Sequence, residues 1–122
     1  MRYIQYSYRD ANNYKQHASI AVTKEPTKRQ LQELRNACEE GEYFIPQQVG
    51  IRPLQDAWDK PDPDADHAWH ELGDGFGKIE VTRWAIDPIC GPIHPRVLVA
   101  RFQQAAREGW DIMLWEGNWE EE

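Results

Sequence analysis

The chain opens with Arg2-Tyr3-Ile4-Gln5-Tyr6-Ser7-Tyr8, a stretch in which the side chains alternate with a period of two. Aromatic enrichment at that period favours a strand over a helix, so residues 2–8 are predicted to form one. Residues 9–15 are rich in turn-forming side chains, and residues 17–23 again have the pattern of a strand. The three segments together predict a β-hairpin.

Two helices are predicted farther along the chain. Thr27 and Gln30 have the spacing of a capping box, which predicts a helix over about 28–40. Pro95 suits the first position of a second helix, over about 95–108. The expected apolar stripes consist of Leu31, Leu34 and Cys38 in the first helix and of Leu98, Phe102 and Ala105 in the second.

Shorter patterns predict further strands. Residues 67–72 and 78–86 are expected to be strands joined by a hairpin turn in the glycine-rich segment 73–77. Residues 110–115 are apolar at nearly every position, which predicts a strand inside the sheet. The tryptophans expected in the core are Trp84, Trp110 and Trp115, whereas Trp58 and Trp119 are candidates for a partner surface.

The rest of the chain predicts irregular structure. Residues 43–53 hold two short apolar pieces that each end at a proline, and the run 87–95 with its three prolines is expected to be a loop. The predicted elements make one α+β domain over residues 1–122. It consists of an antiparallel or mixed sheet of about five strands with two helices packed on it.

The negative charge is concentrated in one segment. The chain has 122 residues, with 14 lysines and arginines against 21 acidic residues and a net charge of −7. Residues 55–77 hold seven acidic residues and one lysine, which is −6 of that total. An acidic loop is predicted over 55–66 and an acidic tail over 117–122. General nucleic-acid binding is disfavoured because phosphates attract the opposite charge.

Two further patterns concern location and redox state. The chain has no run of 18 apolar residues, and the residues after Met1 lack the apolar run of a signal peptide. We therefore expect no membrane binding and a cytoplasmic location. Cys38 and Cys90 stand apart with no CxxC motif, and both are predicted to be free thiols.

A cluster of metal-binding residue types lies in the acidic segment and consists of Asp62, Asp64, Asp66, His67, His70 and Glu71. An EF-hand loop that begins at Asp62 would need a glycine at His67, and the two histidines are three residues apart instead of the four of a zincin helix. We therefore predict neither a metal nor another cofactor.

A ligand site is predicted where two polar clusters meet. The first hairpin contributes Arg9, Asp10, Asn12, Tyr14 and Lys15, and the later strand contributes Trp69, His70 and Glu71. Arg9 and Lys15 would supply donors to a small anionic or nucleotide-like ligand, and Tyr14 and Trp69 would offer stacking faces. The simpler alternative is that the two basic residues only neutralise neighbouring carboxylates.

Three segments resemble small uncharacterised bacterial cytosolic proteins. They are Tyr8-Arg9-Asp10-Ala11-Asn12-Asn13-Tyr14-Lys15, then Gly41-Glu42-Tyr43-Phe44-Ile45-Pro46 with Val49-Gly50, and finally Asp66-His67-Ala68-Trp69-His70-Glu71. The resemblance covers about residues 3–72 and brings no assigned activity. It implies a compact cytosolic domain in which the three segments form one surface.

Two functions stay open from the sequence. The first is a non-enzymatic binding or interaction protein that meets a protein partner or small ligand, or acts as an inhibitor that offers carboxylates to a basic groove. The alternative is a small hydrolase or nucleotide-processing enzyme, with or without a divalent metal, that uses Asp10, His67, His70 and Glu71. Such an enzyme needs these groups in one pocket, whereas an interaction protein needs only a surface. The oligomeric state is open as well.

Overall fold

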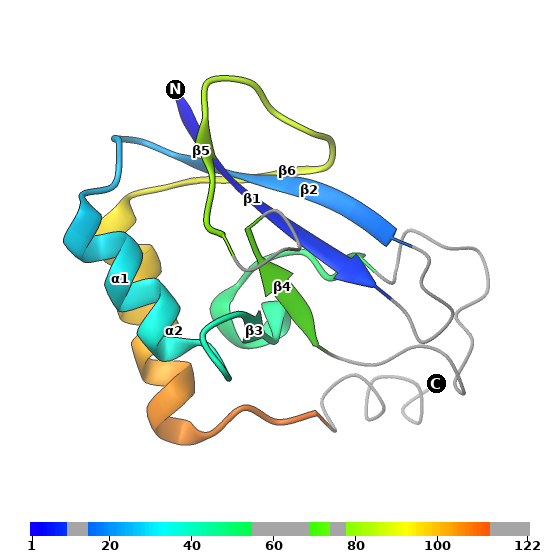
Figure 1. The fold of residues 1–122 in the computed structure, drawn as a ribbon, viewed down its shortest axis with the longest axis vertical. Coiled ribbons are helices and arrows are strands. Elements are labelled where there is room, and N and C mark those ends of the chain that lie inside the picture. The colour runs from blue at the N-terminus through cyan, green and yellow to red at the C-terminus, as the bar shows by residue number, and fades with distance from the viewer. Residues whose placement is uncertain (10–14, 55–68, 74–77, 113–122) are drawn as a thin grey trace.

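Strand β1 (Arg2–Arg9) lies inside a mixed sheet (Figure 1). The structure is a computed structural model, and it describes residues 1–9, 15–54, 69–73 and 78–112. β1 pairs antiparallel with β2 (Lys15–Val22) along its whole length, from Arg2 opposite Val22 to Arg9 opposite Lys15. Both strands of the predicted hairpin are therefore confirmed. Its turn lies outside the described residues.

The other edge of β1 is covered by two short strands in succession. Both β4 (His70–Leu72) and β5 (Val81–Thr82) run antiparallel to β1, with Leu72 opposite Tyr6 and Val81 opposite Ile4. In the described part of the chain they pair with β1 and not with each other, so they act as one interrupted strand. The predicted hairpin between 67–72 and 78–86 is wrong, because both segments find the same partner edge.

Gly73 marks the point where this interrupted strand leaves β1. Its φ is +106°, and a β-carbon there would collide with the carbonyl group of Lys78. The backbone can therefore turn out of the sheet and approach itself closely at this position only because residue 73 has no side chain.

The two edges of the sheet are β3 (Tyr43–Phe44) and β6 (Ile89–Ile93), in the order β3-β4-β1-β2-β6 with β5 also on β1. β6 runs parallel to β2, which makes the sheet mixed. The expectation of a loop over 87–95 is wrong. Proline is tolerated in an edge strand, and the register shift between Ile20 and Val22 accommodates the irregular backbone of β6.

The two helices lie side by side along one side of the sheet (Figure 1), as their mutual contacts require. α1 (Lys28–Ala37) begins with the predicted capping box between Thr27 and Gln30 but ends three residues earlier than expected, with Cys38 as its C-cap. α2 (Pro95–Glu108) has the predicted bounds. The segment between β3 and the acidic loop contains a short 3-10 helix, η1 (Pro46–Val49).

The core lies between the helices and the even-numbered face of β1. Tyr6 and Tyr8 of β1 are fully buried there, and the predicted helix stripes meet them. The stripe residues that the structure buries are Leu34, Cys38, Leu98, Phe102 and Ala105, and Leu31 packs against them half-buried. The shared helix–sheet core is therefore confirmed.

The opposite face of the sheet is crossed by residues 83–88, which lead from β5 on one side of the hairpin to β6 on the other. A chain of hydrogen bonds fastens this crossing. The Gln5 amide donates to Thr82 Oγ1 at 2.8 Å, Ser19 Oγ donates to Gln5 Oε1 at 3.0 Å, and the Ile86 N–H donates to Ser19 Oγ at 2.7 Å. The polar pair Gln5 and Ser19 is buried and satisfied by this chain.

Two expectations about tryptophans need correction. Trp84 belongs to the crossing segment, and its side chain is 56% exposed. The bonds from the strands reach this segment at backbone groups, the Trp84 carbonyl and the Ile86 N–H, so its attachment does not require the Trp84 ring to face the sheet. Residues 110–112 are not a strand, although Trp110 does pack against the core. Trp115 and the rest of the predicted inner strand lie outside the described residues, as do the acidic loop and tail with Trp58 and Trp119.

Candidate binding site at the β3–β4 edge

The strand register aligns four polar side chains across the sheet. Tyr43 of β3 pairs with Glu71 of β4, Glu71 pairs with Ser7 of β1, and Ser7 pairs with His17 of β2. Cross-strand partners point to the same face, so these residues share the face opposite the core. One step along the hairpin, the predicted donors Arg9 and Lys15 pair with each other on that same face.

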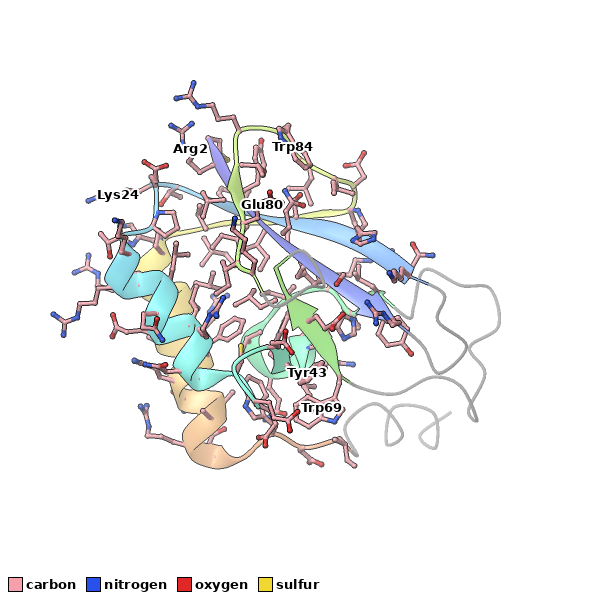
Figure 2. All side chains as sticks on the ribbon, in the orientation of Figure 1. Arg2, Lys24, Tyr43, Trp69, Glu80 and Trp84 are labelled. Atoms are coloured by element: carbon pink, nitrogen blue, oxygen red, sulfur yellow. The ribbon has the colours of Figure 1, made fainter. Side chains whose placement is uncertain are left out.

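An aromatic series leads from the core to this edge of the sheet. Phe102 lies 5.1 Å from Phe44 and 6.2 Å from Trp110, measured between ring centroids. Trp110 lies 6.5 Å from Trp69, which in turn lies 6.5 Å from Tyr43. The last two rings are half-buried and lie near each other at one end of the molecule (Figure 2), so the core supports an aromatic surface there.

A pocket of about 420 Å³ opens beside these two rings, and the described residues that line it are Glu39, Glu40, Tyr43 and Trp69. A tight turn between α1 and β3 forms one wall. Glu39 and Tyr43 exchange two backbone hydrogen bonds, of 2.7 and 2.9 Å, and the turn between them is left-handed at Glu40 (φ +54°) and Gly41 (φ +76°). The turn places two exposed carboxylates next to two aromatic rings.

The charge of the described residues around the pocket is predominantly negative. The ion pairs within 4.0 Å in the described part of the chain are Arg2–Glu25 and Arg29–Glu33. None of the carboxylates around Tyr43 takes part in them; these carboxylates belong to Glu39, Glu40, Glu42 and Glu71. Burial raises the pKa of the Tyr43 phenol, the carboxylates of Glu42, Glu71 and Glu40 raise it further, and Arg9 opposes them.

His70 does not belong to the predicted ligand site, because its side chain faces the core. Its side chain is fully buried on the core face of β4, where its ring lies 4.9 Å from that of Tyr8 and 6.1 Å from that of Phe44. Its Nε2 accepts a hydrogen bond of 2.9 Å from the Leu54 N–H. Successive residues of a strand point to opposite faces, so His70 turns inward where Glu71 turns outward.

The remaining predicted site residues divide into two groups. Arg9, Lys15, Trp69 and Glu71 are described. Tyr43 links three of them, because it pairs with Glu71, contacts Trp69 and lies within the field of Arg9, while Lys15 lies opposite Arg9 in the hairpin. Asp10, Asn12 and Tyr14 lie outside the described residues. Of the alternative catalytic set, Asp10 and His67 lie outside as well, and His70 and Glu71 lie on opposite faces of β4.

The sequence reasoning missed the pocket residues Glu39, Glu40 and Tyr43. Their signal is an acidic run at the end of α1 directly before an aromatic residue, in the stretch Glu39-Glu40-Gly41-Glu42-Tyr43. The run resembles a solvated helix end, and only the antiparallel pairing of β3 with β4 brings Trp69 beside it.

No protein-family model, curated protein or solved structure matches this chain. The resemblance to bacterial cytosolic proteins therefore stays a prediction. Among the described residues, no three histidine, cysteine, aspartate or glutamate side chains gather closely enough to hold a metal ion. Neither described helix has the length and apolar character that spanning a bilayer requires.

Proposed function

We propose that this chain is a non-catalytic interaction protein of the cytoplasm that binds a positively charged protein partner at its β3–β4 edge. The observation that carries the proposal is the pocket itself, in which carboxylates that form no ion pair with another described residue stand beside two half-buried aromatic rings. Carboxylates arranged in this way attract and orient a basic surface, and aromatic rings supply contact area at low entropic cost. An inhibitor that offers its carboxylates to a basic groove is one form of this function.

The small anionic ligand expected from Arg9 and Lys15 is a weaker candidate for this pocket. Those two residues lie opposite each other in the register at the end of the hairpin, whereas the described residues that line the pocket contribute two carboxylates and no base. An anion would therefore meet repulsion at the pocket. A partner with exposed lysine or arginine side chains meets attraction.

Two variants with equal changes in charge test the proposal. The first, Glu39→Gln/Glu40→Asn/Glu42→Gln, neutralises the turn beside the pocket. The second, Asp62→Asn/Asp64→Asn/Asp66→Asn, neutralises three carboxylates of the acidic segment. Each reduces the net charge of −7 by three, so general attraction to a cation falls equally in both.

The probe is an octalysine peptide, and its affinity for each variant is measured by calorimetry at several salt concentrations. We expect the turn variant to lose affinity and salt dependence while the aspartate variant behaves like the wild type apart from a small common decrease. Equal losses of octalysine affinity in the two variants would contradict a local binding site at the turn. A loss confined to the aspartate variant would move the binding surface to residues 62–66.

A further inference from the structure

The rings of Tyr43 and Trp69 form a corner. Their centroids are 6.5 Å apart and their planes are inclined at 66°. A planar cation such as guanidinium can lie flat against one ring face at a time, whereas a rounded ammonium group can contact both walls of such a corner at once. The shape of the pocket therefore favours an ammonium over a guanidinium.

A second tryptophan packs against the Trp69 wall of this corner. Trp110 packs against Trp69 at 6.5 Å with an interplanar angle of 61°, and its indole N–H donates a 3.1 Å hydrogen bond to the carbonyl of Ala37 at the end of α1. Trp110 also packs on Phe102 of the core. A side chain that is already held in place loses little conformational entropy when a ligand binds, so more of the contact energy contributes to affinity.

The carboxylates supply the charge that such a corner needs. Glu39 and Glu40 are exposed at the pocket, and the charges of Glu42 and Glu71 act on the Tyr43 phenol. Of the described charges that act on that phenol, three are glutamates and one is Arg9. The balance favours a cation, and aromatic faces attract a cation most strongly where water is partly excluded.

We propose that the corner of Tyr43 and Trp69 binds the ammonium group of a lysine side chain in the protein partner, and binds it more tightly once that lysine is N-methylated. This inference rests on the proposed function and names the group that the site recognises. Methylation preserves the positive charge and adds apolar surface that both rings can cover. The ammonium group lies in the corner against the two inclined ring faces, and the carboxylates of Glu39 and Glu40 face its charge.

Four short acetylated peptides test this preference directly. They are identical except for a central lysine, trimethyllysine, arginine or norleucine, and binding is followed by NMR through the indole N–H resonances, with that of Trp69 assigned from a Trp69→Phe variant. We expect trimethyllysine to bind at least about threefold more tightly than lysine, a factor in the range of one cation–π contact. Lysine should bind more tightly than arginine, because a rounded ammonium group can contact both inclined rings whereas a planar guanidinium can stack on only one of them. The norleucine peptide, which has the alkyl chain without the charge, should not bind.

Variants of the two walls then locate the site. Tyr43→Leu and Trp69→Leu should each weaken the trimethyllysine peptide by at least about threefold, and Tyr43→Phe, which keeps the ring, should retain most of the affinity. Trp84→Leu is the matched control, because Trp84 is an exposed tryptophan at the other end of the molecule (Figure 2). The urea denaturation midpoint of each variant shows whether it is folded. If Trp69→Leu does not fold, Tyr43→Leu and Glu40→Asn test the site in its place.

Three results would overturn the inference. They are arginine binding as tightly as trimethyllysine, norleucine binding equally well, or folded wall variants that match Trp84→Leu. Octalysine binding that depends on Glu39, Glu40 and Glu42 but not on the rings would refute the corner while leaving the proposed function intact. Absence of octalysine binding as well would refute both.

Discussion

His70 shows how one side chain can be polar, buried and structural at the same time. It lies among the rings of Tyr6, Tyr8 and Phe44, and its Nε2 is the acceptor for the buried N–H of Leu54. A buried donor without an acceptor is costly, so the position requires an acceptor as much as it requires bulk. The residue joins the segment after η1 to strand β4.

A pair of substitutions at position 70 separates these two requirements. His70→Leu fills the volume but leaves the Leu54 N–H without an acceptor, and we expect it to lower the free energy of unfolding by about 1–3 kcal/mol beyond any packing effect. His70→Gln places an amide oxygen near the former Nε2 and should recover part of the loss. Urea denaturation of both variants measures the difference, and a leucine variant as stable as the glutamine variant would contradict a role for the hydrogen bond.

Cys38 gives a prediction about alkaline pH. Burial raises the pKa of its thiol from 9.0 to about 12, with a smaller opposing effect of Arg35. The unfolded chain releases this proton first, so the stability that the buried thiol contributes is complete below pH 9 and is lost as the pH rises towards 12. The wild type should therefore lose up to about 1.4 kcal/mol per pH unit more than Cys38→Ala in this range.

The measurement for Cys38 is the free energy of unfolding in urea, taken for both proteins at intervals from pH 8 upwards. Other groups that titrate at high pH, Tyr6 among them, are common to both proteins and cancel in the comparison. Parallel curves for the two proteins would show that the thiol is not buried as described.

At the scale of the elements, the helices follow from local signals and the strand pairings do not. The capping box of Thr27 and Gln30 and the proline at the start of α2 act within one turn of backbone, so the sequence predicts both helices closely. β4, β5 and β6 are short, and each exists because a longer strand offers it an edge. A pattern of a few residues cannot show which edge that is.

The helix–sheet interface supports a prediction at this scale. Leu34 of α1 and Phe102 of α2 are buried in one cluster with strand residues, so Leu34→Ala and Phe102→Ala should each lower stability by about 2–5 kcal/mol. Val97→Ala is the control from α2, because Val97 is 44% exposed and should change stability little. If denaturation midpoints of the two core variants equal that of the control, the shared core does not exist as described.

At the scale of the whole molecule, the candidate site is only partly readable from sequence. Arg9, Lys15, Trp69 and Glu71 were predicted from the density of polar groups. Glu71 pairs with Tyr43, Trp69 contacts it and Arg9 acts on its phenol, whereas Lys15 is placed only opposite Arg9 in the hairpin. The inward turn of His70 follows from strand alternation once β4 is known. The pocket carboxylates could not be predicted, because their neighbour Trp69 comes from a segment about thirty residues away and reaches them only through the pairing of β3 with β4.

The interrupted strand on β1 also has a consequence in time. β1 has its partner β2 once residue 22 is made, but the described strands that cover its second edge begin at His70 and end at Thr82. While the ribosome adds the residues between, the nascent hairpin presents a row of unpaired amides and carbonyls, which is the kind of edge that recruits foreign strands. The nascent chain is thus most prone to aggregation during the synthesis of residues 23–82, and protection by chaperones would matter most in that interval.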